Sequence, residues 1–439
     1  MKQLWKRFFP EREELSWSQC AKWLTPFNLF LGIMLILTVL CPIMIYASDG
    51  QVWEMLLFAD EHDSFMDHFN SVKNFGYHDS LADMYMGERQ IYPPLVMLVY
   101  YLMYRLVPSW LVFSTGYEAR LRQEAAFPFM MQFVLISILL AVVLYHLTEG
   151  TPRHKWLVTA LLFCSTPMIY LIERGNIIYP ALLFITLFFL LKDSPTPWKR
   201  EVGSLCLAVA AGLKLYPALF GLLLINRRQW KQGVRCMLYG VLVSFIPLLI
   251  IGVEIIPPMI AAWTNFTGGS VGRIVQYQIS FHSAFSLIGE LIPALSGFAR
   301  GAGALAWILG ILAIGVSFLH RDWRASTLLG LVCACIIKVS YIYALVFLIP
   351  SLIGFLNTAA REKRVLHYCY AFFFLCLFAP FPFIVRVAEL NGEIIHLTLL
   401  IQNFGVLALT LTLIGEGIYC GIRQLIPYLQ ERFAAVKEA

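Results

Sequence analysis

Charged residues are scarce in this chain. Of its 439 residues only 14% are Asp, Glu, Lys or Arg, whereas soluble domains carry roughly 25%. Hydrophobic residues make up 59% of the chain, and the mean hydropathy is +0.72. Apolar runs of about 20 residues, each long enough to cross a bilayer as a helix, recur through most of the length. The composition therefore excludes an ordinary soluble domain and predicts an integral membrane protein.

The chain also lacks the patterns that indicate zinc sites, disulfide frameworks or nucleic-acid binding. Its ten cysteines are scattered, and most of them lie inside apolar runs. Cys333 and Cys335 are two positions apart, so a helix would point them away from each other. We expect the cysteines to be small buried hydrophobes. No Lys/Arg patch is interleaved with exposed aromatics, so nothing supports binding to nucleic acid.

Two further absences bear on the membrane segments. The first apolar run is too long for the hydrophobic region of a signal peptide, so it is expected to be a retained span. No period of 20–50 residues repeats, and the two halves of the chain show no matching broken helices of the kind common in secondary transporters.

The spacing of the apolar runs predicts an all-α polytopic membrane protein of about 12–13 transmembrane helices in a single domain, 1–439. Basic residues before the first run place the N-terminus in the cytoplasm by the positive-inside rule. The segment 93–127 either crosses twice or dips into the membrane and returns. The expected order is a first span at 28–48, an outer loop at 49–92, core spans within 93–253, an outer loop at 254–302 and C-terminal spans within 303–421.

One polar segment interrupts the apolar pattern between the first two predicted spans. Residues 60–94 read DEHDSFMDHFNSVKNFGYHDSLADMYMGERQIYPP and hold seven acidic residues and three histidines. Asp60, Asp63, Asp67 and Asn70 have the spacing of one helical stripe. We expect one or two short helices on the outer membrane surface, where a carboxylate can perform acid–base chemistry. The alternatives are a solvated loop helix or a metal site, and no fixed ligand motif supports a metal.

Other unusual polar residues fall on the same outer side once the loops are sorted by their positive charge. They are Glu173, Arg174, Asn176, Lys214, Tyr216, His282, Ser283, Lys338, Ser340, Tyr341 and Tyr343. An ionisable group at membrane depth costs roughly 2.5–3.5 kcal/mol, which makes Lys214 a functional candidate. The alternative for Lys214 is a side chain that snorkels to the interface, and that for Arg174 is a plain interfacial turn. A cation opposite a carboxylate suits a lipid phosphate that carries a leaving-group sugar, because the cation stabilises the departing phosphate.

Four motifs in this order resemble a known family. They are Asp63-Ser-Phe-Met-Asp67-His-Phe-Asn70-Ser71, Tyr92-Pro-Pro-Leu95, Arg174-Gly-Asn176 and Gly212-Leu-Lys214-Leu-Tyr-Pro217. The layout of a first span, an outer loop with an Asp-containing helix, and Tyr-Pro-Pro-Leu at the second span is similar to the GT-C superfamily of polytopic glycosyltransferases. The four motifs together resemble glycosyltransferase family 87, which includes polyprenyl-phosphomannose-dependent α-1,2-mannosyltransferases. The resemblance covers roughly residues 28–360.

The resemblance implies a hexosyltransferase of the cell membrane with its active site on the outer face. It would move a sugar, with mannose favoured, from a polyprenyl-phosphate-sugar donor to a lipid-linked or cell-envelope glycan acceptor, with inversion and without a metal or other cofactor. Asp63 or Asp67 would be the general base, with Asp63 the better match, and Lys214 would contact the phosphate. The expected substrate-binding residues are Tyr92, Arg174, Asn176, Lys214, Tyr216, His282, Ser340 and Tyr343.

The chain departs from the family pattern at two places. It has Glu173-Arg174-Gly175-Asn176 instead of the more usual Gly-Gln-x-Asn, and Tyr343 stands where a His or Trp is expected. The alternative functions are a transporter or flippase of a lipid-linked or small polar solute, and a non-catalytic membrane assembly subunit. A transporter needs ionisable residues near the bilayer midplane, whereas the charges here gather at one membrane face, which favours an enzyme.

Overall fold

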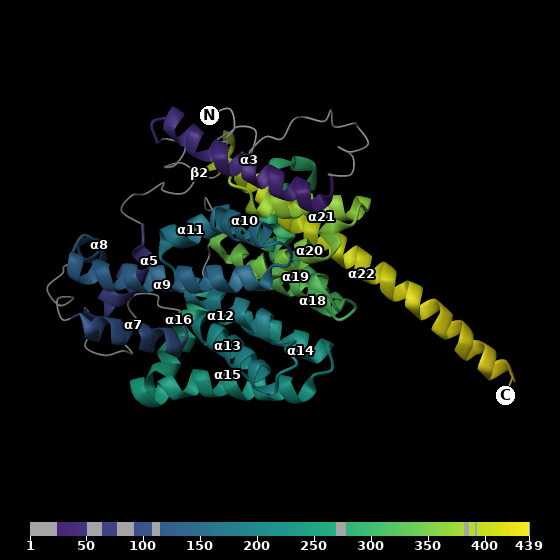
Figure 1. Ribbon diagram of the computed structural model, residues 1–439, viewed down its shortest axis with the longest axis horizontal. Helices are drawn as coiled ribbons and strands as arrows, with labels where there is room; N and C mark the ends of the chain where they lie inside the picture. Colours follow the sequence, from purple (N-terminus) through teal and green to yellow (C-terminus); the bar gives the residue numbers. More distant parts are fainter. Residues whose placement is uncertain are drawn as a thin grey trace, which may run out of the picture.

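The computed structural model describes residues 24–50, 64–76, 92–107, 115–268, 278–381, 386–390 and 393–438. Almost all of this part of the chain is helical (Figure 1). Its strands form one antiparallel hairpin, β1 (Arg386–Leu390) and β2 (Glu393–His396). The predicted all-α polytopic fold is therefore confirmed.

The helices fall into two length classes and a set of 3-10 segments. The long helices are α3 (Pro26–Ala47), α9 (Gln123–Leu147), α15 (Trp230–Ile251), α18 (Ser296–Ser317) and α22 (Leu397–Glu438). The shorter helices are α5 (Met66–Lys73), α7 (Pro94–Leu106), α8 (Gly116–Arg120), α10 (Pro152–Phe163), α11 (Thr166–Arg174), α12 (Ile178–Leu191), α13 (Pro197–Leu213), α14 (Leu222–Asn226), α16 (Ile256–Gly268), α17 (Phe281–Leu291), α19 (Trp323–Cys335), α20 (Ile349–Asn357) and α21 (Val365–Phe378). The 3-10 segments are η2 (Asn74–Gly76), η4 (Tyr216–Gly221), η5 (Val253–Ile255), η6 (Pro293–Leu295), η7 (Ile342–Leu348) and η8 (Ala359–Arg361).

The long helices carry the apolar surface that a bilayer requires. Within the described residues, five helical stretches are long and apolar enough to cross a membrane: α3, α9, α15, η6 with α18, and the part of α22 up to Arg423. On α15 the large side chains of Met237, Phe245 and Leu249 are 64%, 57% and 80% exposed. Such a surface is unfavourable in water and suits contact with lipid tails.

Between these stretches, the described residues form shorter apolar helices. Helices α10 and α11 are bent by 55° at the break between them and count as a sixth span if taken together. Helix α13 ends just before Lys214, and η4 and α14 follow it. The breaks follow local chemistry, since prolines at 167 and 217 each begin a new helical segment. The segment 254–302, expected as an outer loop, contains α16 and α17.

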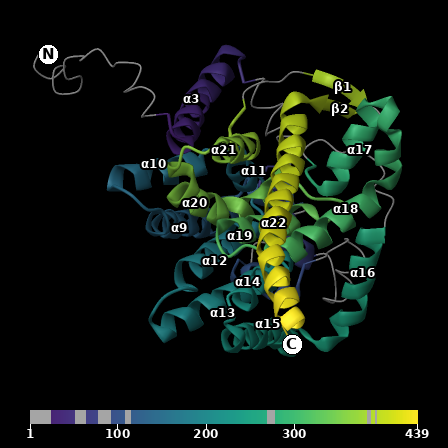
Figure 2. The same ribbon diagram turned by 90° about the vertical axis from the view of Figure 1, so that its right-hand side faces the viewer.

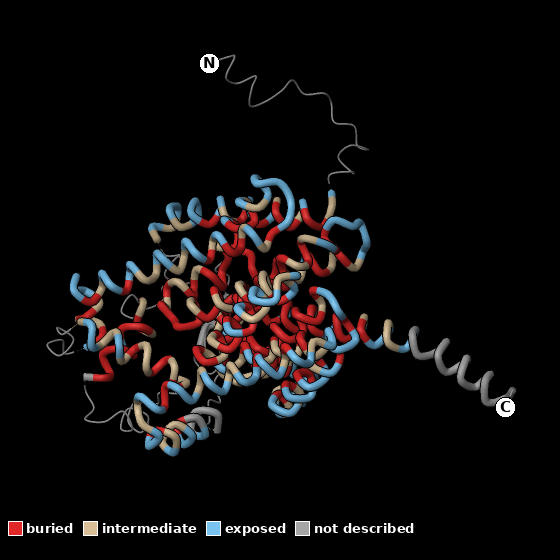
Figure 3. Tube along the Cα trace, turned by 60° about the horizontal axis from the view of Figure 1, so that its bottom comes forward, coloured by how far each residue is buried: buried red, intermediate tan, exposed pale blue. Residues whose placement is uncertain are grey.

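The core lies around α19, η7 and α20. Every residue of α19 except Arg324 is buried, and η7 and α20 are almost equally buried. Figure 2 shows α19 and α20 among the other helices, and Figure 3 shows the buried residues concentrated in the middle of the molecule. The long helices with exposed apolar faces lie outside this core.

A second hydrophobic cluster positions the short helix α5. Phe69 and Val72 of α5 are 1% and 0% exposed, and they pack against Val96, Met97 and Tyr100 of α7. Figure 1 shows α5 among α7, α8 and α9 at one end of the molecule. The described part of the polar segment, 64–76, is thus helical, as predicted, and is anchored by buried aromatic and aliphatic side chains.

Candidate active site

The acidic helix α5 begins later than its sequence pattern suggests. Phe65, the residue before α5, has φ = 62°, a left-handed conformation that ends a right-handed helix. The described part of the predicted stripe is therefore α5, which begins at Met66 and carries Asp67 and Asn70. Asp60 and Asp63 themselves lie outside the described residues.

Two hydrogen bonds hold the start of α5 in place. The Phe65 N–H donates to the Glu173 carbonyl at 2.6 Å, and Arg120 Nη1 donates to the Ser64 carbonyl at 2.8 Å. The first bond ties α5 to the last turn of α11, and the second ties it to α8. The direction of α5, and hence of Asp67, is fixed by contacts with elements distant in sequence.

The turn between α11 and α12 requires a glycine. Gly175 has φ = 61°, and a Cβ at this position would lie 3.2 Å from the Phe65 Cα and 3.2 Å from the Phe129 Cζ. Only glycine combines this conformation with such a close approach of two backbones. Asn176 then begins α12 by accepting a hydrogen bond from the Ile178 N–H at 2.9 Å.

Asp67 of α5 accepts hydrogen bonds from two residues of the turn between α11 and α12. Arg174 Nη2 donates to Asp67 Oδ1 at 2.6 Å, and Asn176 Nδ2 donates to Asp67 Oδ2 at 2.7 Å. The side chains of Asp67 and Arg174 are each 18% exposed. A charged pair at this depth is held firmly, because water competes weakly for its hydrogen bonds.

Burial adjusts the proton affinity of Asp67. It raises the pKa of this carboxyl to about 6, against the lowering effects of the Asn176 hydrogen bond and the Lys214 charge. A pKa near 6 leaves the group ionised at neutral pH and still basic enough to accept a proton. Burial has the opposite effect on the neighbouring His68, whose pKa it lowers to about 3, so His68 is neutral at neutral pH.

Lys214 directly follows the last residue of α13. The backbone turns extended at Lys214, with φ = −149° and ψ = 124°, and η4 begins at Tyr216. A Cβ on Gly212 would lie 2.6 Å from Val243 Cγ1 and 3.0 Å from Leu95 Cδ2, so the absent side chain lets α13 pack closely against α7 and α15. The Gly-Leu-Lys-Leu-Tyr-Pro motif therefore combines a close helix contact, a helix end and a cation.

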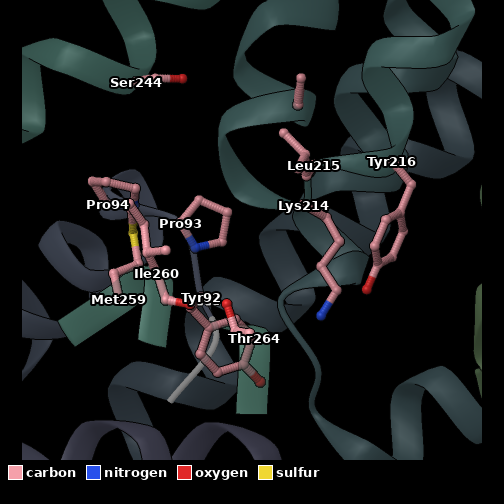
Figure 4. Close-up of a pocket in the computed structure, with 11 residues that line it drawn as sticks. Tyr92, Pro93, Pro94, Lys214, Leu215, Tyr216, Ser244, Met259, Ile260 and Thr264 are labelled. Atoms are coloured by element: carbon pink, nitrogen blue, oxygen red, sulfur yellow. Dashed lines mark hydrogen bonds between the residues drawn. The ribbon is translucent and has the colours of Figure 1, made fainter. Parts of the chain in front are cut away.

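Aromatic rings surround the Lys214 ammonium group. Lys214 Nζ lies 5.0 Å from the centroid of the Tyr92 ring and 5.7 Å from that of Tyr216. Both distances are in the range of cation–π contacts. Figure 4 shows Lys214 between these two tyrosines.

The same three residues line a mostly apolar cavity of about 280 Å³. Its other walls come from Pro93, Pro94, Ala211, Leu215, Ser244, Met259, Ile260 and Thr264 (Figure 4). Ligand cavities of this type combine apolar walls with a few polar groups that orient the ligand. Here Tyr92, Lys214 and Tyr216 supply polar groups at one side of the cavity, and Ser244 and Thr264 are the other polar residues of its lining.

The structure gathers most of the predicted site residues around Asp67. Tyr92, Tyr343 and Lys214 all interact electrostatically with the Asp67 carboxylate. The Tyr343 ring stacks on Tyr170, with centroids 5.8 Å apart. Asp67, Tyr92, Arg174, Asn176, Lys214, Tyr216 and Tyr343 therefore form one group, which we call the Asp67 site.

His282 and Ser340 lie on two segments that meet at the start of α17. His282 lies near Lys338 and 3.5 Å from the Ser286 hydroxyl. The Ser340 hydroxyl donates to the Ala334 carbonyl at 2.5 Å. The backbone carbonyl of Ser340 accepts a hydrogen bond from the Ile279 N–H at 2.7 Å. These contacts join the start of α17 to the segment before η7. Their described contacts do not bring His282 or Ser340 to Asp67.

Sequence reasoning assigned no role to two residues beside the Asp67 site. Glu173 is 2% exposed, hydrogen-bonds with Ser64 and interacts with the Asp67 carboxylate. The sequence feature that could have indicated Glu173 is its position beside Arg174, in a polar break between two apolar runs. Tyr170 stacks on Tyr343 but sits in an apolar run, where nothing in the sequence distinguishes it from a core aromatic. Within the described ranges, no three His, Cys, Asp or Glu side chains are close enough together to hold a metal ion.

Comparison with known proteins identifies the family. The sequence model of glycosyltransferase family 87 matches residues 91–348, which is more than half of the chain. The match includes Tyr92, Arg174, Asn176 and Lys214, and it begins after α5, so it is shorter than the resemblance expected over 28–360. No curated protein and no solved structure matches the chain. The protein is a multi-pass membrane protein that belongs to glycosyltransferase family 87, whose members transfer a sugar from a donor to an acceptor.

Proposed function

We propose that the protein transfers a hexose, with mannose favoured, from a polyprenyl-phosphate donor to a lipid-linked or cell-envelope glycan on the outer face of the cell membrane. Asp67 is the general base and Lys214 binds the donor phosphate. The observation that carries this proposal is an oriented carboxylate, Asp67, that interacts electrostatically with Lys214, a cation in the lining of an apolar cavity. Asp63, outside the described residues, is the alternative base.

Asp67 has the capacity to accept a further proton. Its two oxygens offer about four lone-pair positions, and Arg174 and Asn176 each use one of them. An acceptor hydroxyl can take another position on either oxygen. The two donors hold the carboxylate in one orientation, which favours a fixed path for the proton.

The transfer step then balances as a single displacement. The acceptor oxygen forms a bond to the anomeric carbon while its proton moves to an Asp67 oxygen. The bond between the anomeric carbon and the phosphate oxygen breaks, and its electron pair stays on the phosphate. Attack from the side opposite the leaving group inverts the anomeric centre.

Lys214 is better suited than Arg174 to the leaving phosphate. Arg174 is already paired with Asp67 at 2.6 Å, whereas the Lys214 ammonium lies over the faces of Tyr92 and Tyr216. A cation held by aromatic faces keeps its N–H groups available for phosphate oxygens. Its charge becomes more effective as negative charge develops on the leaving group.

The cavity suits the lipid part of the donor. Pro93, Pro94, Met259 and Ile260 give it apolar walls next to the polar end. A polyprenyl chain can lie along such walls while its phosphate stays near Lys214. A transporter or flippase, the alternative function, has no comparable support, since the family match concerns a glycosyltransferase.

The direct test is product formation from defined donors. Purified protein is incubated with a panel of polyprenyl-phosphate sugars and a lipid-linked glycan acceptor, and the lipid products are analysed by mass spectrometry. Transfer from one polyprenyl-phosphate hexose, absent in Asp67→Asn, supports the proposal. Transfer only from nucleotide sugars, or translocation without a new glycosidic bond, would contradict it.

A further inference from the structure

A buried carboxyl group lies beside the Asp67 site and takes no part in the transfer step described above. It belongs to Glu173, in the last turn of α11, and this residue is 2% exposed. Glu173 hydrogen-bonds with Ser64 and interacts electrostatically with the Asp67 carboxylate. A carboxyl group at this depth is costly to bury unless it is paired with a cation or keeps its proton. Which of the two applies decides what Glu173 does at the site.

Two contacts of Glu173 hold the residues that precede α5. Its side chain bonds with Ser64, and its backbone carbonyl accepts the Phe65 N–H at 2.6 Å. Its Oε2 atom is buried and has no hydrogen-bond partner in the part of the chain that the structure describes. Because α5 begins at Met66, directly after these two residues, Glu173 helps to fix the position of the helix that carries Asp67.

The nearby charges favour an uncharged Glu173. The guanidinium of Arg174 pairs with Asp67 at 2.6 Å, and no ion pair of the described residues includes Glu173. The Asp67 carboxylate would repel an ionised Glu173, because the two charges have the same sign. Two neighbouring buried carboxyl groups do not both ionise readily, and Asp67 is the one that has the cation. Glu173 is therefore expected to keep its proton at neutral pH.

The nearest elements carry further titratable groups, which do not supply Glu173 with a cation. Among the described residues they are His68 on α5, Tyr92 and Tyr100 at α7, Arg120 on α8, Tyr170 on α11, Lys214 after α13 and Tyr343 on η7. Tyrosines are uncharged at neutral pH, and His68 is neutral as well because burial lowers its pKa to about 3. Arg120 Nη1 donates to the Ser64 carbonyl at 2.8 Å, and Lys214 interacts with the Asp67 carboxylate.

We propose that Glu173 is a positioning residue of the sugar-transfer site and that it acts as an uncharged carboxylic acid. In this form it holds Ser64 without adding a charge beside the ion pair of Asp67 and Arg174. Loss of its proton would place two carboxylates at the junction of α5 and α11, and their repulsion would displace α5. The inference rests on the proposed function, because it concerns the orientation of Asp67 as the base.

The pH dependence of sugar transfer tests this inference. The values of kcat and KM for the polyprenyl-phosphate donor are measured across neutral and alkaline pH in the wild type and in Glu173→Gln. Glutamine keeps the size and the hydrogen bonding of the uncharged acid but has no proton to lose. We expect Glu173→Gln to transfer like the wild type at neutral pH and to keep its kcat to higher pH. Lys214 and Tyr343 are unchanged in the variant, so the difference between the two profiles belongs to Glu173.

Further variants separate positioning from packing. Glu173→Leu keeps a buried side chain of similar size but loses the hydrogen bond, so kcat is expected to fall about tenfold. KM for the donor should change little, because Lys214 is intact. Ser64→Ala removes the same hydrogen bond, so the double variant should transfer no more slowly than Glu173→Leu alone. Glu290→Gln is the control, because Glu290 is an exposed carboxylate at the end of α17, and its pH profile should match that of the wild type.

Thermal unfolding of the purified full-length protein gives a second readout that does not depend on the substrate. An acid that keeps its proton only in the folded state stabilises the protein less as pH rises, until it ionises in both states. The unfolding midpoint of the wild type should therefore fall relative to that of Glu173→Gln as pH rises. A constant difference between the two midpoints, identical alkaline limbs, or loss of transfer by Glu173→Gln at neutral pH overturns the inference. Absence of product in the wild type contradicts the sugar-transfer proposal instead, and the midpoints then decide whether Glu173 is held as an uncharged acid.

Discussion

Asp67 and Arg174 are 107 residues apart in the chain, and their side chains form an ion pair of 2.6 Å. The pair joins the short helix α5 to the turn between α11 and α12. Because the Phe65 N–H also donates to the Glu173 carbonyl, backbone and side-chain contacts act at the same junction. The orientation of the proposed base therefore depends on the Glu-Arg-Gly-Asn turn.

Replacing Arg174 tests this dependence. Arg174→Ala leaves a half-buried carboxylate without its cation, and we expect it to destabilise the protein by about 1–3 kcal/mol. Sugar transfer should fall more than stability alone explains, because Asp67 loses its fixed orientation. Arg174→Lys, which keeps the charge, should recover part of the activity. The measurements are the thermal midpoint and the transfer rate, and wild-type values for both in Arg174→Ala would contradict the role.

Asn176 gives a prediction about pH. Its hydrogen bond favours the ionised carboxylate and so lowers the pKa of Asp67, against the burial that raises it to about 6. In Asn176→Ala that lowering effect is lost, so the pKa rises and Asp67 is protonated at higher pH. The acid limb of kcat/KM, expected near pH 6 in the wild type, should move to higher pH. A limb that moves to lower pH, or no acid limb at all, would show that Asp67 is not the titrating base.

Gly175 is expected to be intolerant of a side chain. Gly175→Ala combines a left-handed backbone, which costs about 1–2 kcal/mol for other residues, with close contacts to Phe65 and Phe129. The variant should lower the unfolding midpoint and reduce transfer by displacing α5. Gly240→Ala is the control, since a Cβ there meets nothing within 4 Å. Equal behaviour of the two variants would rule out the close packing at residue 175.

Lys214 is expected to act on the donor. Charge-assisted hydrogen bonds contribute about 1.5–3 kcal/mol, so Lys214→Ala should weaken binding of the polyprenyl-phosphate donor by roughly 10- to 100-fold. Lys214→Arg, which keeps a cation, should bind the donor better than the alanine variant. Donor affinity is measured by titration with a non-transferable analogue. Unchanged affinity in Lys214→Ala would remove this residue from the phosphate site.

Several features of the site follow from the sequence because their causes are local. A lysine between two apolar runs, followed by Tyr-Pro, indicates a helix end with a functional cation, and α13 ends at Lys214. The Arg-Gly-Asn break likewise marks a turn between two apolar helices. The family match and the helical membrane architecture confirm the class of protein expected from these motifs.

Other features depend on contacts that no local pattern contains. The start of α5 at Met66 is set by Phe65, which adopts φ = 62° where it lies against Gly175 of the α11–α12 turn. The pairing of Asp67 with Arg174 joins two distant segments, so spacing could not reveal it. The bend between α10 and α11 also depends on packing inside an apolar run, where the sequence contains little local signal.

The most direct measurement is sugar transfer by Asp67→Asn, compared with donor binding by the same variant. Asparagine keeps the shape of the side chain but removes the basic oxygen. We predict that transfer falls on the order of 10²- to 10⁴-fold, while donor affinity stays close to that of the wild type. Glu362→Gln, which changes an exposed carboxylate, should transfer normally. Near-normal transfer by Asp67→Asn would contradict the assignment of Asp67 as the general base.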